Sequence, residues 1–503
     1  MEQGAQRVAA GSTTGPAEGT RTVVLLGAPG SGKSTLAAAL LAEAGAPPPT
    51  APGPGRLAAG SLVRGGTPLW LLDPPGAPDL AGELHAGLRA AGAAVLVVSP
   101  VQGLDPRSAV LWEACAAAGL PRLVVLTQLD RPGADADEAV AVCQRVLGDG
   151  VLPLQLPLHD DDGAVGGVLD LLALQVSEGG TKRAPEPEHL PLVEGLRDDL
   201  LEGVLTGSED EDLFDRWLGG EEPAPDVLAH ELAGAVARGD LQPAVVVSPR
   251  HGVGLADLLD LLAAVLPPAV ARTPPAATAA DGSPAAPLTG APDGPLVAEV
   301  VRGGRPALLR VWSGLLRPGA PVRLGDGSEE PYDGPAAGPG DLAEGLAGPP
   351  GAVLTDPADG ERLRLAGWPA PRAEFPVGVR PDAGLAERVA QDPVARLETD
   401  PRTDQLLLWS AGPEHAELLL AGRPAVPVTV PAGGRPVLVR VQVPAWCAAA
   451  VRGELTARGE VVSSVRTDDG AVIEARLPPG ELVGWAPALA RASASTGTFE
   501  RLP

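Results

Sequence analysis

One short stretch of the chain, GAPGSGKST at residues 27–35, limits what the sequence around it can fold into. It has the spacing G-x-x-x-x-G-K-S/T, and it lies between an apolar run suited to a strand and an Ala- and Leu-rich run suited to a helix. In that context glycines let backbone N–H groups turn inward around phosphates, Lys33 supplies a positive charge, and Ser34 offers a hydroxyl to Mg²⁺. The alternative, a Gly-rich turn before a buried helix, has little need of Lys33. The stretch predicts a nucleotide phosphate site formed by Gly27, Ala28, Pro29, Gly30, Ser31, Gly32, Lys33, Ser34 and Thr35.

The first half of the 503-residue chain alternates strand-like and helix-like runs. Apolar strand-like runs at 23–26, 69–72, 94–98 and 123–126 are separated by helical stretches, as in βαβ units with a parallel sheet. After an acidic region, AVVV at 244–247 and a helix-like run complete the same pattern. We therefore predict an α/β P-loop domain at 21–268, with helices on both faces of a parallel sheet and an inserted subdomain at about 151–240.

The second half of the chain has a different pattern, with short strands broken by Gly and Pro turns. That pattern is typical of a small β-barrel, with a loop at 335–350, and two small α+β units follow it. A Pro-, Ala- and Thr-rich stretch without periodicity precedes the barrel and predicts a linker. The expected boundaries are a disordered N-terminus at 1–20, a linker at 269–292, a β-barrel at 293–368, a reduced α+β domain at 369–424 and a C-terminal α+β sandwich at 434–503.

The composition restricts the classes of partner. A formal net charge of -26 argues against a general nucleic-acid binder, although a local basic patch could still contact an RNA backbone. No window approaches 18 uninterrupted apolar residues, and three cysteines far apart in sequence predict neither a disulfide framework nor a zinc site. We expect a cytoplasmic monomer that binds neither DNA nor a membrane.

Two loops at predicted strand ends bear on the chemistry of the bound nucleotide. In LLDPPGAPDL (71–80), Asp73 ends a strand and a Pro-Pro-Gly turn follows, but Ala77 stands where a water-handling side chain is expected. This leaves open whether the nucleotide is hydrolysed or only bound. In LVVLTQLDRPGAD, the Asp130 carboxylate could accept both N1–H and the exocyclic amine of guanine, worth about 1–3 kcal/mol by analogy with base-edge recognition. A helix cap is the alternative role for Asp130.

The Asp130 loop resembles a guanine-binding loop of the translational GTPases, and the stretch from Asp73 to Ala77 resembles their D-x-P-G-H loop. Asp130 occupies the last position of an N-K-x-D box that has Thr and Gln in place of Asn and Lys, and VVVSPRHGVG resembles the loop that contacts the guanine oxygen. The resemblance implies that Asp73 and Gly76 sense Mg²⁺ and the γ-phosphate, with Asp73 and Ser34 as the metal side. It also implies base contacts from Thr127, Gln128, Asp130, Ser248, Pro249 and Arg250.

The resemblance extends nearly end to end, to elongation factor G and most closely to the elongation factor G-like proteins of high-GC bacteria. It includes the stretches at 86–135, at RVWSGLLRPG (310–319) and at 391–420, and it continues into the C-terminal stretch that contains PVLVRVQVP (436–444). It implies GTP and GDP as ligands, Mg²⁺ as the metal and the ribosome as the partner.

Three departures from the family pattern set the functional alternatives. The family histidine that orients water is replaced by Ala77. The segment between Lys33 and Asp73 has a Pro- and Gly-rich middle at 44–60 with Thr50 as its only threonine, which we expect to be a flexible surface loop rather than a switch that closes over the γ-phosphate. The tract between GPEHAELLLAG and PVLVRVQVP is also too short for the domain that displaces tRNA in the family. We expect a ribosome-associated GTPase with weak or factor-dependent hydrolysis that is not a competent translocase. The alternative is a guanine-nucleotide-binding scaffold or regulator without hydrolysis.

Overall fold

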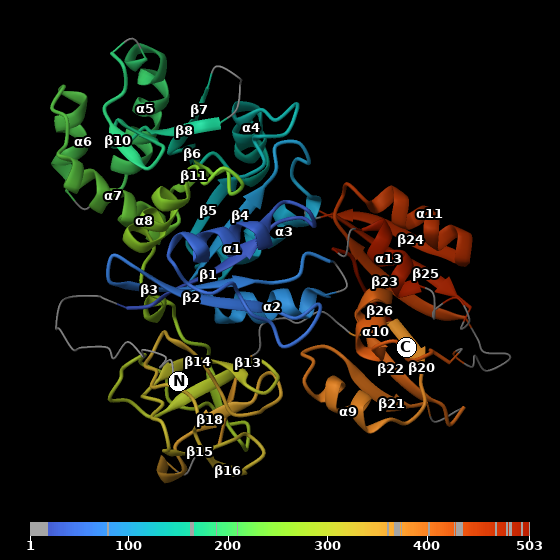
Figure 1. The fold of residues 1–503 in the computed structure, drawn as a ribbon. Helices are drawn as coiled ribbons and strands as arrows, with labels where there is room; N and C mark the ends of the chain where they lie inside the picture. Colours follow the sequence, from blue (N-terminus) through green and yellow to red (C-terminus); the bar gives the residue numbers. More distant parts are fainter. Residues whose placement is uncertain are drawn as a thin grey trace, which may run out of the picture.

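The computed structural model shows a large α/β unit with a β-rich unit and two smaller α+β units packed beside it (Figure 1). Residues 1–18 of the predicted disordered N-terminus lie outside the part of the chain that the structure describes. The structure describes residues 19–501 apart from short gaps at 78–79, 161–164, 188, 209, 360–361, 367–372, 374, 401–402, 427, 429–435, 468–469, 479–480, 482–484 and 494–495.

The α/β unit is built on a seven-stranded sheet in the order β2-β3-β1-β4-β5-β11-β6. Its inner strands pair in parallel, so their carboxyl ends meet at one edge, while β2 runs antiparallel to β3. The strands are β1 (Arg21–Leu26), β2 (Ala58–Arg64), β3 (Thr67–Asp73), β4 (Ala93–Val98), β5 (Arg122–Leu126), β6 (Val151–Pro153) and β11 (Gln242–Val246).

Helices cover both faces of this sheet because side chains alternate along each strand. Val23 and Leu25 of β1 join the core on one face, whereas Val24 and Leu26 join the core on the other. Each of these side chains is at most 1% exposed, and such a burial contributes about 1.5–3 kcal/mol. The predicted fold class is confirmed. One face carries α1 (Lys33–Glu43) and α8 (Leu255–Val265), and the other carries α2 (Ala81–Ala90), α3 (Pro106–Ala117) and α4 (Ala136–Leu147).

An antiparallel four-stranded sheet and three helices lie between β6 and β11 in the chain. β6 itself pairs with β11 and belongs to the central sheet, although it lies inside the range 151–240. The elements of this region are β7 (Gln155–His159), β8 (Val165–Asp170), β9 (Gln175–Glu178), β10 (Thr181–Arg183), α5 (Leu190–Leu205), α6 (Glu211–Leu218) and α7 (Pro225–Arg238).

The β-rich unit is a half-barrel with a six-stranded antiparallel sheet in the order β16-β15-β18-β13-β14-β17. Its strands are β13 (Val297–Arg302), β14 (Ala307–Ser313), β15 (Pro321–Arg323), β16 (Glu329–Pro331), β17 (Leu342–Gly345) and β18 (Val353–Thr355), with the turn η3 (Pro357–Asp359).

The structure differs from two local expectations in this region. β17 lies within 335–350, which was expected to be a loop, and pairs with β14. The expected linker at 269–292 contains the turn η2 (Ala269–Ala271) and the strand β12 (Ala277–Ala279), which pairs with β19 (Leu363–Leu365). These segments are only three or four residues long and are ordered by partners distant in sequence, so a local pattern does not reveal them.

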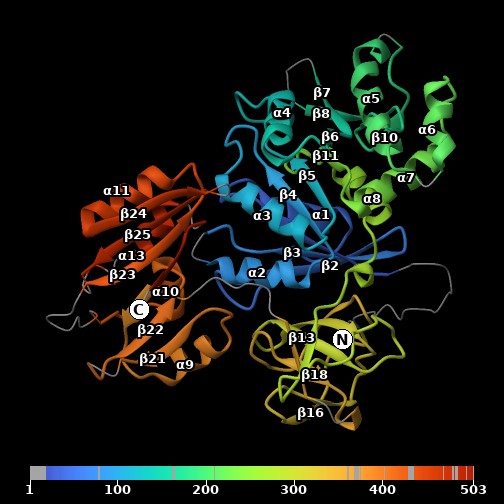
Figure 2. The same cartoon turned by 180° about the vertical axis from the view of Figure 1, so that it is seen from behind.

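Two α+β units complete the chain (Figure 2). The first has a three-stranded sheet in the order β20-β22-β21, and the second a four-stranded sheet in the order β24-β25-β23-β26. The first, called the third domain below, comprises β20 (Phe375–Gly378), α9 (Ala383–Ala390), β21 (Arg396–Thr399), β22 (Leu406–Ser410) and α10 (Pro413–Leu420). The second comprises β23 (Val437–Val443), α11 (Ala448–Arg458), β24 (Glu460–Thr467), β25 (Gly470–Leu477), α13 (Trp485–Ala492) and β26 (Thr498–Arg501). Across the described ranges, no helix combines the length and the apolar character that crossing a bilayer requires.

Candidate nucleotide-binding site

The Gly-rich stretch forms the turn between β1 and α1 at the carboxyl edge of the central sheet. Gly27, Gly30 and Gly32 have φ values of 137°, 82° and 100°, which L side chains rarely adopt. A Cβ on Gly27 would lie 2.4 Å from the Val97 carbonyl oxygen. The loop therefore depends on glycine for its path, as the motif predicted.

Lys33 begins α1 and its side chain folds back over the loop. Its Nζ donates hydrogen bonds to the carbonyl oxygens of Gly27 at 2.7 Å and Ala28 at 2.9 Å. Burial lowers the pKa of Lys33, and the Asp73 carboxylate opposes that shift. The ammonium group is thus held at the phosphate loop, where it would neutralise phosphate charge.

The loop after β3 packs directly on the phosphate loop. A Cβ on Gly76 would lie 2.9 Å from Lys33 Nζ and 3.2 Å from the Pro29 backbone. Only glycine lets these two segments approach so closely without movement of one of them. Gly76 therefore lies beside the end of Lys33 that would face a phosphate, while its predicted role in sensing the γ-phosphate stays a prediction.

Asp73 lies at the end of β3 and is 7% exposed. Burial raises the pKa of its carboxyl group, while a hydrogen bond with Ser34 and the charge of Lys33 act in the opposite direction. Its Oδ1 atom is buried without a hydrogen-bond partner among the described residues. A hard, oxygen-seeking cation such as Mg²⁺ fits this donor set, with Asp73 and the Ser34 hydroxyl on its protein side.

Thr127 and Gln128 support the phosphate loop. Thr127 Oγ1 donates to the Ser31 carbonyl oxygen at 2.7 Å, and Gln128 Nε2 donates to the Gly30 carbonyl oxygen at 2.9 Å. The two side chains that replace Asn and Lys of the family box therefore connect the base-side loop to the phosphate loop.

The base-side end of the site contains Asp130 and the loop after β11. Asp130 and Arg250 form an ion pair at 3.7 Å, with Arg250 69% exposed and Asp130 18% exposed. The Ser248 hydroxyl is buried and lies 2.9 Å from His251 Nδ1. The Asp130 carboxylate thus has an exposed, exchangeable partner, which a guanine base could replace.

These segments surround a cavity of about 620 Å³, within the usual size of a small-molecule site. Gly27 and Ala28 line a smaller neighbouring cavity of about 200 Å³, whereas Ser31, Asp73 and Ser248 are buried and are part of neither lining. The predicted residues that line the larger cavity are Pro29, Gly30, Gly32, Lys33, Ser34, Thr35, Gly76, Thr127, Gln128, Asp130, Pro249 and Arg250.

The larger cavity has further lining residues that the sequence did not predict. Arg131 directly follows Asp130 and could have been included from its position. Gly55 comes from the Pro- and Gly-rich tract, and Glu414 and Leu418 come from α10 of the third domain. Their presence depends on packing between distant segments, for which the sequence holds no local signal.

Ala77 lines both cavities, and His85 of α2 lines the smaller one. Thr50 is not part of either lining; it exchanges backbone hydrogen bonds of 2.9 and 2.8 Å with Ala59 of β2. The tract that was expected to be a flexible surface loop therefore continues into an antiparallel pairing.

The fold and the site define a P-loop GTP-binding protein of the translational GTPase class. The family model described as "Elongation factor Tu GTP binding domain" matches residues 58–268, a range that begins after the phosphate loop. The chain is 34% identical to the "Elongation factor G-like protein" of Mycobacterium tuberculosis, from strains CDC 1551 / Oshkosh and ATCC 25618 / H37Rv, over an alignment of 484 residues. That alignment covers 82% of this chain and 67% of the relative.

A crystal structure of a Thermus thermophilus protein shows the same fold, with a TM-score of 0.76 at 22% identity and 96% of each chain covered. The identity to the mycobacterial proteins, rather than this likeness of fold, shows the family. The chain belongs to the elongation factor G-like proteins.

Proposed function

We propose that the chain binds GTP and GDP with Mg²⁺ and acts at the ribosome as a GTPase whose hydrolysis is weak or depends on a partner. One observation carries the proposal: the Lys33 ammonium is held on the Gly-rich loop, against Gly76 and beside the Asp73 carboxylate. Membership of the elongation factor G-like family supports the ribosome as the partner. The family also supports a cytoplasmic location, and we propose a monomer that binds neither DNA nor a membrane.

The reaction adds water to the γ-phosphorus and breaks its bond to the β–γ bridging oxygen, giving GDP and phosphate. Lys33 and inward-facing backbone N–H groups would bind the phosphate oxygens, and Asp130 would hold the guanine base. Bound Mg²⁺, held by Ser34 and Asp73, would supply positive charge to the phosphate oxygens.

Water positioning is the weak part of this site. The methyl group of Ala77 can neither accept a proton from water nor orient it, and loss of such a group typically costs about 10²–10⁴-fold in rate. We infer that the unassisted reaction is slow for this reason.

We also infer that the protein is not a translocase of the usual kind. α10 ends at Leu420 and β23 starts at Val437, so little chain lies between the third domain and the C-terminal unit. A domain needs about 50 residues or more. The relatives are also longer, since the alignment covers 67% of their length.

The second candidate function is a nucleotide-binding scaffold or regulator that does not hydrolyse GTP. Two observations favour it, namely Ala77 in the cavity lining and the backbone pairing of Thr50 with Ala59. The pairing orders Thr50 through backbone contacts with Ala59, and Thr50 does not line the cavity.

Single-turnover hydrolysis of γ-labelled GTP, with and without 70S ribosomes, separates the two candidates. The GTPase proposal predicts slow phosphate release alone and faster release with ribosomes. Tight GTP binding without phosphate release under both conditions would contradict it and support the scaffold. Ala77→His is the matched variant, and we expect it to raise the ribosome-independent rate.

A further inference from the structure

The nucleotide cavity is not formed by the α/β unit alone. Glu414 and Leu418 of α10 line it together with Lys33, Gly76 and Ala77. They are four residues apart on one helix, so they lie on the same face, one turn from each other. The third domain thus forms part of the cavity wall.

Leu418 fixes this face of α10 against the segments around the phosphates. A Cβ built on Gly55 would lie 2.4 Å from Leu418 Cδ1 and 3.2 Å from Leu80 Cδ1, so these three residues are in close contact. Because Leu418 is packed there, Glu414, one turn earlier, is kept at the cavity.

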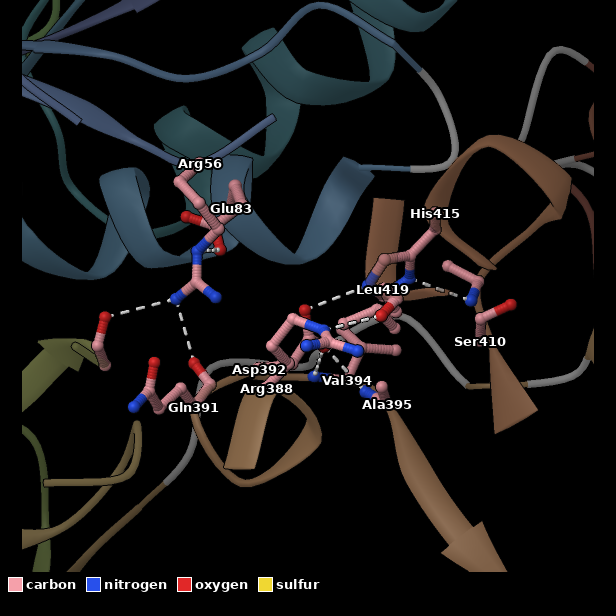
Figure 3. A network of polar contacts seen from close by, with 12 residues as sticks. Arg56, Glu83, Arg388, Gln391, Asp392, Val394, Ala395, Ser410, His415 and Leu419 are labelled. Atoms are coloured by element: carbon pink, nitrogen blue, oxygen red, sulfur yellow. Dashed lines mark hydrogen bonds and ion pairs between the residues drawn. The ribbon is translucent and has the colours of Figure 1, made fainter. Parts of the chain in front are cut away.

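Arg56 connects the same region to two other units, as Figure 3 shows in part. Its Nε pairs with the buried Glu83 carboxylate at 2.7 Å. Its Nη2 donates to the carbonyl oxygens of Gln391 at 2.8 Å and Gly303 at 3.2 Å. A single side chain therefore joins the α/β unit to the half-barrel and to the third domain.

The polar network continues from Gln391 to α10 (Figure 3). The next residue is Asp392, whose Oδ2 atom lies 2.9 Å from His415 Nε2, and both side chains are buried. Ala411 N–H donates to His415 Nδ1, so Nε2 carries the proton that Asp392 accepts. His415 directly follows Glu414, so contacts through Gln391, Asp392 and His415 connect Arg56 to the residue next to Glu414.

We propose that Glu414 sets the preference of the cavity for the diphosphate over the triphosphate, with Arg56 as a positioning residue that holds α10 in place. The inference rests on the proposed function, that is, on guanine nucleotides binding in this cavity. A carboxylate on the cavity wall repels phosphate charge, and GTP carries one negative charge more than GDP. Between two unit charges in water, the Coulomb energy at a separation of about 7 Å corresponds to about threefold in affinity, and this sets the scale of the expected effect.

Two matched variants of the full chain test the role of the Glu414 charge. Affinities for GDP and for a non-hydrolysable GTP analogue are measured with Mg²⁺ at low and high salt. We expect Glu414→Gln to raise the affinity for the analogue relative to GDP by about threefold at low salt and by less at 1 M salt. Glu417→Gln, which removes an exposed charge from α10 outside the cavity lining, should leave the ratio closer to that of the unmodified chain.

Arg56→Ala tests the positioning role in a double-mutant cycle. We expect Arg56→Ala alone to raise the affinity for the analogue relative to GDP, because α10 can then move away from the cavity. In that background Glu414→Gln should change the affinity ratio less than it does in the unmodified chain. An unchanged affinity ratio in Glu414→Gln would overturn the inference while leaving guanine-nucleotide binding intact, and full additivity with Arg56→Ala would overturn the positioning role. Failure of the unmodified chain to bind either nucleotide would instead overturn the proposed function, and this inference with it.

Discussion

At the scale of single residues, the site depends on close contact between two loops from adjacent strands. Gly76 packs closely against Lys33 and Pro29, and the Asp73 carboxylate forms a hydrogen bond with Ser34. The motif at 27–35 predicted the phosphate loop because its glycines allow the positive φ values of the turn and its lysine places a charge on the loop. Sequence alone did not predict that Thr127 and Gln128 brace this loop, because their contacts join residues about a hundred positions apart.

Gly76→Ala tests the close approach of the two loops. The added methyl group would displace Lys33 Nζ or the Pro29 backbone, and overpacking of this kind costs about 1–3 kcal/mol. We expect GDP affinity to fall by about tenfold, measured by calorimetry. Gly53→Ala is the control, because a Cβ there meets no atom within 4 Å and the backbone has no left-handed φ. Equal affinities for the two variants would contradict the steric account.

Asp73→Asn separates metal binding from stability. Burial raises the pKa of Asp73 above its ordinary value of 3.8, so the ionised carboxylate is disfavoured in the folded chain. The stabilisation from its neutral form is present below pH 3.8 and is lost as the pH rises through the folded pKa. At pH 7 the variant without nucleotide should therefore melt at a higher temperature than the unmodified chain, and this difference should vanish near pH 3.

The same variant should lose Mg²⁺-dependent nucleotide affinity, by about tenfold or more, because it lacks the carboxylate on the metal side. A lower melting temperature of the variant at pH 7 would contradict the effect of burial on Asp73, and an undiminished Mg²⁺ effect would count against its assignment to the metal.

At the scale of elements, α2 is held at both ends by residues of other segments. Near its N-terminus, Glu83 accepts a hydrogen bond from Leu57 N–H at 2.7 Å and pairs with Arg56. At its C-terminus, Arg272 donates to the carbonyl oxygens of Leu88, Arg89 and Ala91. These carbonyls have no partner within the helix, so Arg272 acts as a cap supplied by the chain that leads into the half-barrel.

Arg272→Met should loosen α2. Loss of a donor to buried carbonyl oxygens costs about 1–3 kcal/mol, and faster amide hydrogen exchange across Ala81–Ala90 should report it. Arg272→Lys keeps a charge and donors, and we expect it to recover part of the protection. Unchanged exchange in the Met variant would show that α2 does not depend on this cap.

At the scale of the whole molecule, buried cations join the units. Arg310 is 1% exposed and donates to the Ala269 carbonyl oxygen at 2.6 Å, and Arg89 pairs with Glu299 at 2.8 Å. Arg89, Arg272 and Arg310 lie 5.5, 5.8 and 5.0 Å from the ring centre of Trp312. Such contacts join the half-barrel to the α/β unit, where α2 packs against β13.

Sequence patterns predicted the parts of the molecule that local physics determines. Buried strands such as β4 are apolar throughout, and the phosphate loop has fixed spacing, so both were found from the residues. β2 was missed because it directly follows a Pro- and Gly-rich tract, and β12 because it has only three residues and is ordered by its pairing with β19. The wall contributed by Glu414 was missed for a related reason, since contacts between domains leave no periodic signal in the chain.

Calorimetric titration of the full chain with GDP in the presence of Mg²⁺, repeated with Lys33→Ala, tests whether the phosphate loop and Lys33 hold a guanine nucleotide. We expect saturable binding to one site for the unmodified chain, at least about tenfold weaker binding for the variant, and no comparable binding of ADP. Absence of binding to the folded, unmodified chain, or equal affinity in Lys33→Ala, would contradict this expectation.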